Sequence, residues 1–288
     1  MEKGVVVVIS REKEQEYIEK LKKNPLLLRE IEEQTEAMCL TAVKRSGKAL
    51  EFAKIQTPEI CMKAIKRSGK NLEFVEHQTE ELCLEAVKKY GLGLKYVENQ
   101  TNEICLEAVK QNGLALEYVE EQTHTICLAA VKENGYALEY VKEQTYDICL
   151  GAVKRHGLSL KFVKNQTEPL CLEAVKEHPF ALEYVEKQTS KICLEAIKQS
   201  EHILRFIKKQ TPEICLEAVK INGTSLMYIG SRTKEVEKIG MVVGSNNLNS
   251  HDYIRQRRSY RRIRYRLASK EISLNQSLYH VLEQLYRY

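Results

Sequence analysis

Residues 101–122 read TNEICLEAVKQNGLALEYVEEQ, and this stretch decides the fold because close copies of it fill most of the chain. The cysteines show the spacing, since each one follows the last by 22 residues: Cys39, Cys61, Cys83, Cys105, Cys127, Cys149, Cys171, Cys193 and Cys215. A fixed period of this kind is the sequence signature of a repeat protein. Nine units cover residues 35–232, and we number the places of each unit 1 to 22 from its threonine.

Each unit predicts two short helices. Thr101 is a good N-cap, Lys110 puts positive charge in the last helical turn, and Gly113 fits a left-handed stop. The first helix is therefore expected over residues 102–112. A second, shorter helix is expected from about Leu114 to Glu121, and it can be partly 3₁₀ because 22 residues leave little room for two helices and two turns.

The apolar face of the first helix is wide. Laid out at 100° per residue, it forms an arc of about 200° that is broader than a surface helix needs. The residues on this arc are Ile104, Cys105, Leu106, Ala108, Val109 and Asn112. The pattern predicts an all-α fold, an α-solenoid of nine two-helix repeats in which each first helix packs between two copies of itself. Leucine-rich repeats share this period, but the units lack their strand segment.

Outside the array, the sequence predicts three further segments. Residues 1–34 form an N-terminal segment and a degenerate cap repeat, because residues 22–34 match the second half of a unit. Residues 233–250 are a decayed repeat and linker, and residues 251–288 are a basic helical tail. This tail holds nine Lys and Arg against three Asp and Glu, a net charge of +6 that exceeds the +5 of the whole chain.

The composition indicates a protein of a reducing compartment. The cysteine count of nine is odd, the apolar run Val5–Ile9 is too short for a signal-peptide core, and no stretch approaches the roughly 20 apolar residues of a membrane span. We therefore expect an intracellular protein that is neither secreted nor bound in a membrane.

The repeat motif resembles a known family. Residues 130–140 read AVKENGYALEY and residues 108–118 read AVKQNGLALEY. These stretches are similar to the AVKxNGxALxY signature of an uncharacterised helical-repeat domain that is abundant in giant DNA viruses of amoebae. The resemblance covers the array only and implies the fold and a viral origin, with a host cytoplasm or nucleus as the compartment. It implies no functional residue, because the family has no assigned activity.

The invariant polar residues favour structural roles. Zinc ligands must converge within about 2.3 Å of the metal, whereas equivalent residues of stacked helices lie about 8–10 Å apart, so the cysteines are interpreted as core residues. The lysine at place 10 suggests a polyanion-binding ladder, but a solvated face that matches the helix dipole is preferred. The glutamine at place 22 is expected to bond backbone between units. No catalytic, cofactor-binding or metal-binding residue is predicted, and no enzyme.

Two candidate surfaces remain. Solenoids bind partner proteins on long repeated surfaces, and the places that vary between units form such an edge, with candidates Tyr90, Glu133, Arg155, His156 and His178. The tail is a candidate for nucleic acid, because Arg with Tyr suits phosphate contacts and base stacking. Its candidate residues are Arg255, Arg257, Arg258, Tyr260, Arg261, Arg262, Arg264, Tyr265 and Arg266. It could equally be an import signal, a docking segment for an acidic partner, or the solvated face of a helix.

Overall fold

The computed structural model describes residues 9–246, and these residues form helices without a strand in that range. The all-α repeat fold is confirmed. The α-helices are α1 (Arg11–Lys23), α2 (Glu36–Arg45), α3 (Pro58–Arg67), α4 (Glu80–Lys89), α5 (Asn102–Gln111), α6 (His124–Glu133), α7 (Tyr146–Arg155), α8 (Glu168–Glu177), α9 (Ser190–Ile197), α10 (Pro212–Ile221) and α11 (Lys234–Asn246). The 3₁₀ helices are η1 (Pro25–Glu30), η2 (Gly47–Phe52), η3 (Gly69–Phe74), η4 (Gly91–Tyr96), η5 (Gly113–Tyr118), η6 (Gly135–Tyr140), η7 (Gly157–Phe162), η8 (Pro179–Tyr184), η9 (Glu201–Phe206) and η10 (Gly223–Tyr228).

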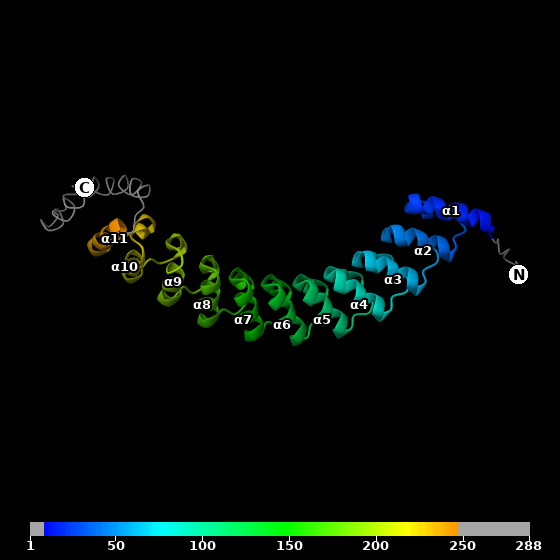
Figure 1. Cartoon of the computed structure of the whole chain (residues 1–288). Helices are drawn as coiled ribbons and strands as arrows, with labels where there is room; N and C mark the ends of the chain where they lie inside the picture. Colours follow the sequence, from blue (N-terminus) through cyan, green and yellow to red (C-terminus); the bar gives the residue numbers. More distant parts are fainter. Residues whose placement is uncertain (1–8, 247–288) are drawn as a thin grey trace. The chain divides into compact units, whose positions relative to one another are not determined.

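Contacts divide the described residues into two compact units, one up to residue 196 and one from residue 197. In the first unit, α1 to α8 follow one another along a gently curved row (Figure 1). Each α-helix from α2 to α8 contacts its own 3₁₀ helix and the 3₁₀ helix that precedes it, as in a solenoid. In the second unit, α10, η10 and α11 pack on one another.

The α-helices begin at the predicted N-cap, but the way in which they end differs from the prediction. The Thr101 hydroxyl accepts a hydrogen bond from the Ile104 amide at 3.3 Å, which is the expected N-cap. The helix ends because Asn112 adopts an extended conformation, with φ −151° and ψ 110°. The predicted left-handed stop is wrong, since Gly113 has no positive φ and is the first residue of η5.

Close packing, rather than backbone conformation, explains the glycine at place 13. A Cβ atom on Gly113 would lie 2.4 Å from the carbonyl oxygen of Ala130 and 2.9 Å from Cβ of Asn134, both in the next repeat. Gly135 and Gly157 face the next repeat in the same way. A side chain at this place would therefore push adjacent repeats apart.

The second helix of each repeat is a six-residue 3₁₀ helix, shorter than the predicted span of 114–121. The Asn112 side chain caps η5 by accepting a hydrogen bond from the Leu114 amide at 3.0 Å. A 3₁₀ helix rises about 2.0 Å per residue and an α-helix about 1.5 Å. The six residues of the 3₁₀ helix therefore span almost the same length as the ten residues of the α-helix. The tighter helix thus closes the repeat within 22 residues.

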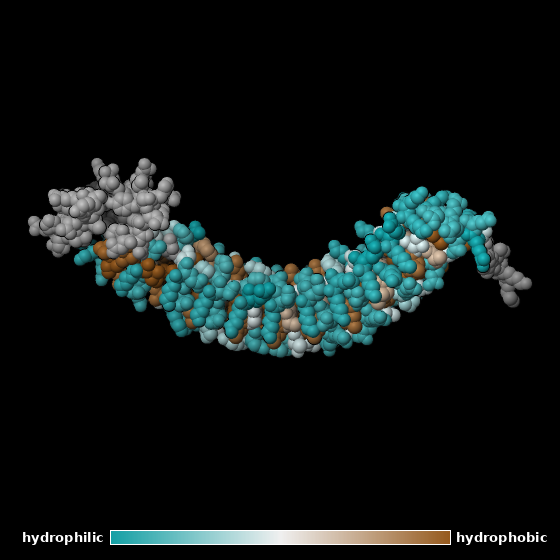
Figure 2. Space-filling model, viewed as in Figure 1, coloured by the Kyte–Doolittle hydropathy of each residue, from teal (hydrophilic) through white to brown (hydrophobic). Residues whose placement is uncertain are grey.

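The core of each repeat comes from both helices. In α5 the buried residues are Ile104, Cys105, Ala108 and Val109, and in η5 they are Gly113, Ala115 and Leu116. Leu106 is half-buried, and Asn112 lies beyond the end of the helix, so the buried arc is narrower than predicted. On the face of the first unit shown in Figure 2, hydrophobic residues emerge mainly as narrow bands between hydrophilic ones.

The array begins with a unit of its own kind. Ser10 caps α1, which has 13 residues where the helices α2 to α8 have ten. α1 packs on α2 and on η1, and Leu21 and Leu28 of this unit are fully buried. The unit therefore covers the apolar side of the first repeat, as a cap must.

Candidate functional site at the repeat junctions

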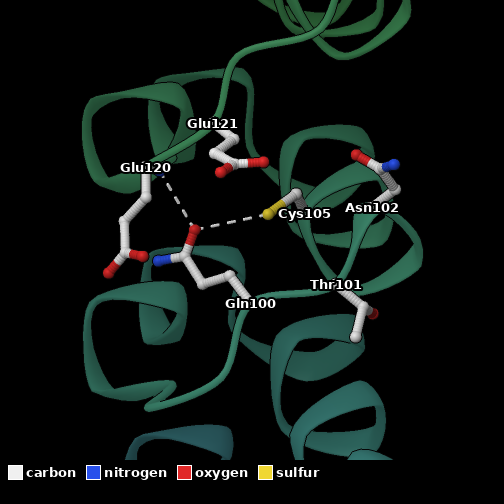
Figure 3. Close-up of a pocket in the computed structure, with 6 residues that line it drawn as sticks. All are labelled: Gln100, Thr101, Asn102, Cys105, Glu120 and Glu121. Atoms are coloured by element: carbon white, nitrogen blue, oxygen red, sulfur yellow. Dashed lines mark hydrogen bonds between the residues drawn. The ribbon is translucent and has the colours of Figure 1, made fainter.

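The junction between repeats is built around the glutamine at place 22. The Gln100 amide donates to the Tyr118 carbonyl at 2.8 Å, and its oxygen accepts from the Glu120 amide at 3.1 Å (Figure 3). The same oxygen also accepts from the Cys105 thiol at 3.4 Å. One side chain thus connects the end of its own repeat to both helices of the next.

The same bonds recur at other junctions. Gln78 and Gln122 make all three of them. In the capping unit, Gln34 donates to the Phe52 carbonyl at 2.8 Å and accepts from the Cys39 thiol at 3.2 Å. The prediction that this glutamine bonds backbone between units is confirmed.

Sequence reasoning missed the partnership between glutamine and cysteine. The cysteines are buried and free, as expected for core residues, but the seven thiols from Cys39 to Cys171 also donate to the preceding glutamine. The signal was available, because a glutamine stands five residues before every one of the nine cysteines.

Burial keeps these thiols protonated. Removal from water raises the pKa of Cys83 to about 11, and the nearby carboxylates of Glu98 and Glu80 act in the same direction. Burial also raises the pKa of Cys105, and the Glu120 carboxylate adds to the effect. A protonated thiol is a hydrogen-bond donor and a poor nucleophile or metal ligand. Within residues 9–246, no group of three or more His, Cys, Asp or Glu side chains could hold a metal ion.

A polar pocket of about 370 Å³ opens at this junction. It is lined by Gln100, Thr101, Asn102, Cys105, Glu120 and Glu121, and Figure 3 shows these side chains around it. Gln100 and Cys105 are already bonded to each other, and the Glu120 and Glu121 side chains are exposed. The pocket offers carboxylates and an amide edge to a ligand, but no nucleophile held by a base.

The candidates of the variable edge lie where successive α-helices end, and they mainly connect repeats. Arg155 Nε donates to the Glu133 carbonyl at 3.1 Å, one repeat earlier. His156 Nδ1 accepts from the Gly135 amide at 3.0 Å, and its ring stacks on Tyr136 with centroids 4.9 Å apart. These contacts satisfy backbone groups at the helix ends.

Tyr90 and His178 occupy the same place as His156. The Lys70 ammonium lies 4.9 Å from the centre of the Tyr90 ring, a cation–π contact between repeats. His178 Nδ1 is buried without a hydrogen-bond partner among the described residues. Gln111 has the same bridging role as His156, since its oxygen accepts from the Gly91 amide at 2.6 Å. Sequence reasoning missed Gln111, although it stands at the variable place 11.

The lysines at place 10 are solvent-exposed, in agreement with the interpretation as a solvated face. Lys110 pairs with Glu107 at 2.8 Å and Lys220 with Glu217 at 2.6 Å, and both lysine side chains are about half exposed. Exposed pairs of this kind contribute about 0.2–1 kcal/mol. The candidate residues of the basic tail, Arg255 to Arg266, lie outside the described residues.

The fold and the junctions define the class of this protein: a helical-repeat protein whose short units are joined by a half-buried glutamine. Within this class, the model of a domain of unknown function, DUF4116, matches residues 79–123, 124–168 and 189–234. Each match spans two consecutive repeats, so these stretches of the chain are similar to this uncharacterised domain family. No curated protein and no solved structure matches the chain. Within residues 9–246, no helix is both long and apolar enough to cross a membrane.

Proposed function

We propose that the repeat array is a non-catalytic scaffold that presents an exposed, variable surface to a protein partner. One observation carries the proposal: glutamine and cysteine, which recur in the repeats, are bonded between repeats, whereas some of the side chains that differ between repeats lie exposed at helix ends. Gln100 and Cys105 belong to the first set, and Glu133 and Tyr146 to the second. The buried, protonated thiols support a role without chemistry.

Site-specific photocrosslinking in the full-length chain tests this function. A photoreactive residue at Glu133 or Tyr146 should capture one and the same protein in the cells where the chain acts, because both places vary and are exposed. A photoreactive residue at Lys132 is the matched control, since it is equally exposed but identical in every repeat. Capture of no protein at either variable position would contradict the scaffold function.

A second candidate is association with nucleic acid through residues 251–288, and their net charge of +6 favours it. Binding through arginine contacts to phosphates should weaken steeply with added salt. Deleting residues 251–288 from the chain should abolish the binding. Unchanged binding of the deletion variant to DNA or RNA would refute this function for the tail.

The repeat motif resembles a domain family that is abundant in giant viruses, so we also propose that this protein acts inside an infected cell. Free cysteines throughout the array are compatible with a reducing compartment.

A further inference from the structure

In the first unit, cations gather where the α-helices end. Places 10, 11 and 14 of the capping unit and of the first three repeats hold ten exposed cations: Lys22, Lys23, Lys44, Arg45, Lys48, Lys66, Arg67, Lys70, Lys88 and Lys89. No carboxylate stands between places 10 and 14 in these four units. We call this set of ten residues the basic edge.

Carboxylates gather where the same row of helices begins. Places 20 and 21 and the following places 2 and 3 hold eleven exposed glutamates: Glu32, Glu33, Glu36, Glu59, Glu76, Glu80, Glu81, Glu98, Glu103, Glu120 and Glu121. We call this set the acidic edge. Lys54 is the one lysine or arginine at these places up to residue 125, and its ammonium donates to the Glu32 carbonyl at 2.8 Å.

The two edges lie on opposite sides of the row. A ten-residue α-helix is about 15 Å long, so its two ends are too far apart for their side chains to pair. The ion pairs of the basic edge are local: Lys22 with Glu19 at 2.6 Å and Lys89 with Glu85 at 3.8 Å, each within one helix. The acidic pocket beside Gln100 opens on the other edge. Most charges of both edges therefore face outward.

Helix dipoles explain only part of this pattern. Cations at the end of an α-helix and carboxylates in its first turn are favourable. Lys48 and Lys70, however, are the second residues of the 3₁₀ helices η2 and η3, where positive charge is unfavourable. Later repeats have Leu114, Tyr136 or Phe180 at this place. The Lys70 ammonium lies over the Tyr90 ring, and helix dipoles do not explain Lys48, so the basic edge carries more positive charge than its own helices favour.

We propose that the basic edge binds the acidic edge of a second copy of this chain. Both edges belong to the same repeats, so the places that carry their charges recur once in every 22-residue unit. A copy displaced sideways brings one edge against the other along several repeats at once. The contact joins two different surfaces and leaves one edge free on each copy, so association continues sideways. This proposal is independent of the function proposed above.

High salt should dissociate the assembly into monomers. Exposed ion pairs are individually weak, and the Debye length falls from about 10 Å at 0.1 M salt to about 3 Å at 1 M. Analytical ultracentrifugation of the full-length chain should show a mass that grows with protein concentration at the lower salt. At the higher salt, the chain should sediment as a monomer. A monomer at both salt concentrations would overturn the proposal, even if the chain then bound DNA or an acidic polymer.

Charge reversal identifies the surfaces. The basic-edge variant carries Arg45→Glu, Arg67→Glu and Lys89→Glu, and the acidic-edge variant carries Glu76→Lys, Glu98→Lys and Glu120→Lys. Both variants should fold, because the natural chain already has Glu133 and Glu177 at place 11, where the basic-edge variant introduces glutamate. It also has Lys142 and Lys164 at place 20, where the acidic-edge variant introduces lysine. Each variant alone should associate more weakly than the natural chain, since three reversals reduce the net charge of the changed edge to +4 on the basic edge or −4 on the acidic edge, where Lys54 is included. An equimolar mixture should associate again.

A matched control separates edge contacts from total charge. The variant with Glu51→Lys, Glu73→Lys and Glu117→Lys makes the same charge change on the 3₁₀ helices, where Lys95 and Lys161 already occur. It should associate like the natural chain. If only the acidic-edge variant lost association, the basic tail would be the occupant and the proposal would be wrong. A mixture of the two edge variants that stayed monomeric would also overturn it.

Discussion

Gln100 uses both functional groups of its side-chain amide. Its NH₂ group donates to the Tyr118 carbonyl, while its oxygen accepts from the Glu120 amide and the Cys105 thiol. Arg232, which stands at place 22 of the last repeat, has no such oxygen. Among the described residues it donates to carbonyls of its own repeat, those of Leu226 at 2.6 Å and Ile229 at 3.3 Å. Within residues 9–246, the glutamine bonds between repeats therefore end with Gln210.

We expect Gln100→Ala to lower the free energy of unfolding by about 1–3 kcal/mol, because it leaves the Tyr118 carbonyl and the Glu120 amide without partners. Gln100→Glu should also destabilise, since a carboxylate cannot donate to the carbonyl. Glu121→Ala is the control and should change stability by less than about 0.5 kcal/mol. Urea denaturation followed by circular dichroism measures all three. Equal stability of Gln100→Ala and Glu121→Ala would contradict the bridging role.

The thiols should react slowly in the native protein. All nine are buried and free, and burial raises the pKa of Cys83, Cys171 and Cys193 to about 11. A thiol reagent at neutral pH should label few of them before unfolding and all nine in denaturant. Rapid labelling of the native chain would show that the repeats do not stack as described.

Stability should fall at alkaline pH. The pKa of Cys83 is about 11 in the folded chain and about 8.5 in an unfolded one, so the folded state holds the proton more tightly between these values. This contribution is complete below about pH 8.5 and is lost as the pH rises through about 11. Thermal melting of the natural chain and of Cys83→Ala over this range measures it, and the variant should lose less stability. Parallel curves would contradict the assignment.

The glycine at place 13 shows how two elements of different repeats constrain each other. Gly113→Ala should destabilise by about 1–3 kcal/mol, because the added methyl group would press on the Ala130 carbonyl at 2.4 Å. Gly151→Ala is the matched control within helix α7, where a Cβ would meet only Val131 and Leu128 at 3.4 and 3.5 Å. It should be neutral or stabilise by up to about 1 kcal/mol through helix propensity. Denaturation midpoints of the two variants check this, and the reverse order would refute it.

The start of each α-helix was predictable from sequence, and its end was not. The threonine N-cap is a local signal, because the hydroxyl bonds an amide three residues away. Gly113 resembles a helix stop in sequence, yet its reason is contact with a carbonyl of the next repeat. Contacts between repeats are not encoded in the local pattern. The 3₁₀ form of the second helix was not predictable from the local pattern either, since it depends on the length of the α-helix that the second helix must span within a 22-residue repeat.

An array of identical junctions should tolerate the loss of one whole unit. Deleting residues 123–144 joins Gln122 to Thr145, which recreates the glutamine–threonine junction that precedes each of the nine repeats. The shortened chain should fold with the same helicity per residue and a lower melting temperature, because stability in repeat proteins is roughly a sum over units and interfaces. Deleting residues 123–133 alone removes α6 and leaves η6 without its helix, so helicity should drop. Equal behaviour of the two deletions in circular dichroism would contradict the repeat boundaries.

The candidate edge was predictable only in part. Variation between repeats predicted a partner-binding edge that includes places 11 and 12, but it did not indicate the bonds that these places make between repeats. His156 and Gln111 both accept from a glycine amide of the preceding repeat, which makes them bridges. The charges of the basic and acidic edges were in the sequence as well. Their meaning required the helix bounds, which place one set at the beginning of the helices and the other at the end.

The sequence by itself determined the repeat length, the helical class and the residues of the core, because a strict 22-residue period with helical spacing admits few other folds. The tertiary structure decided what the recurring polar residues do. Glutamine, cysteine and glycine each contact an atom that belongs to an adjacent repeat. Such contacts depend on how units stack, and stacking is a property of neighbouring repeats together rather than of one repeat read alone.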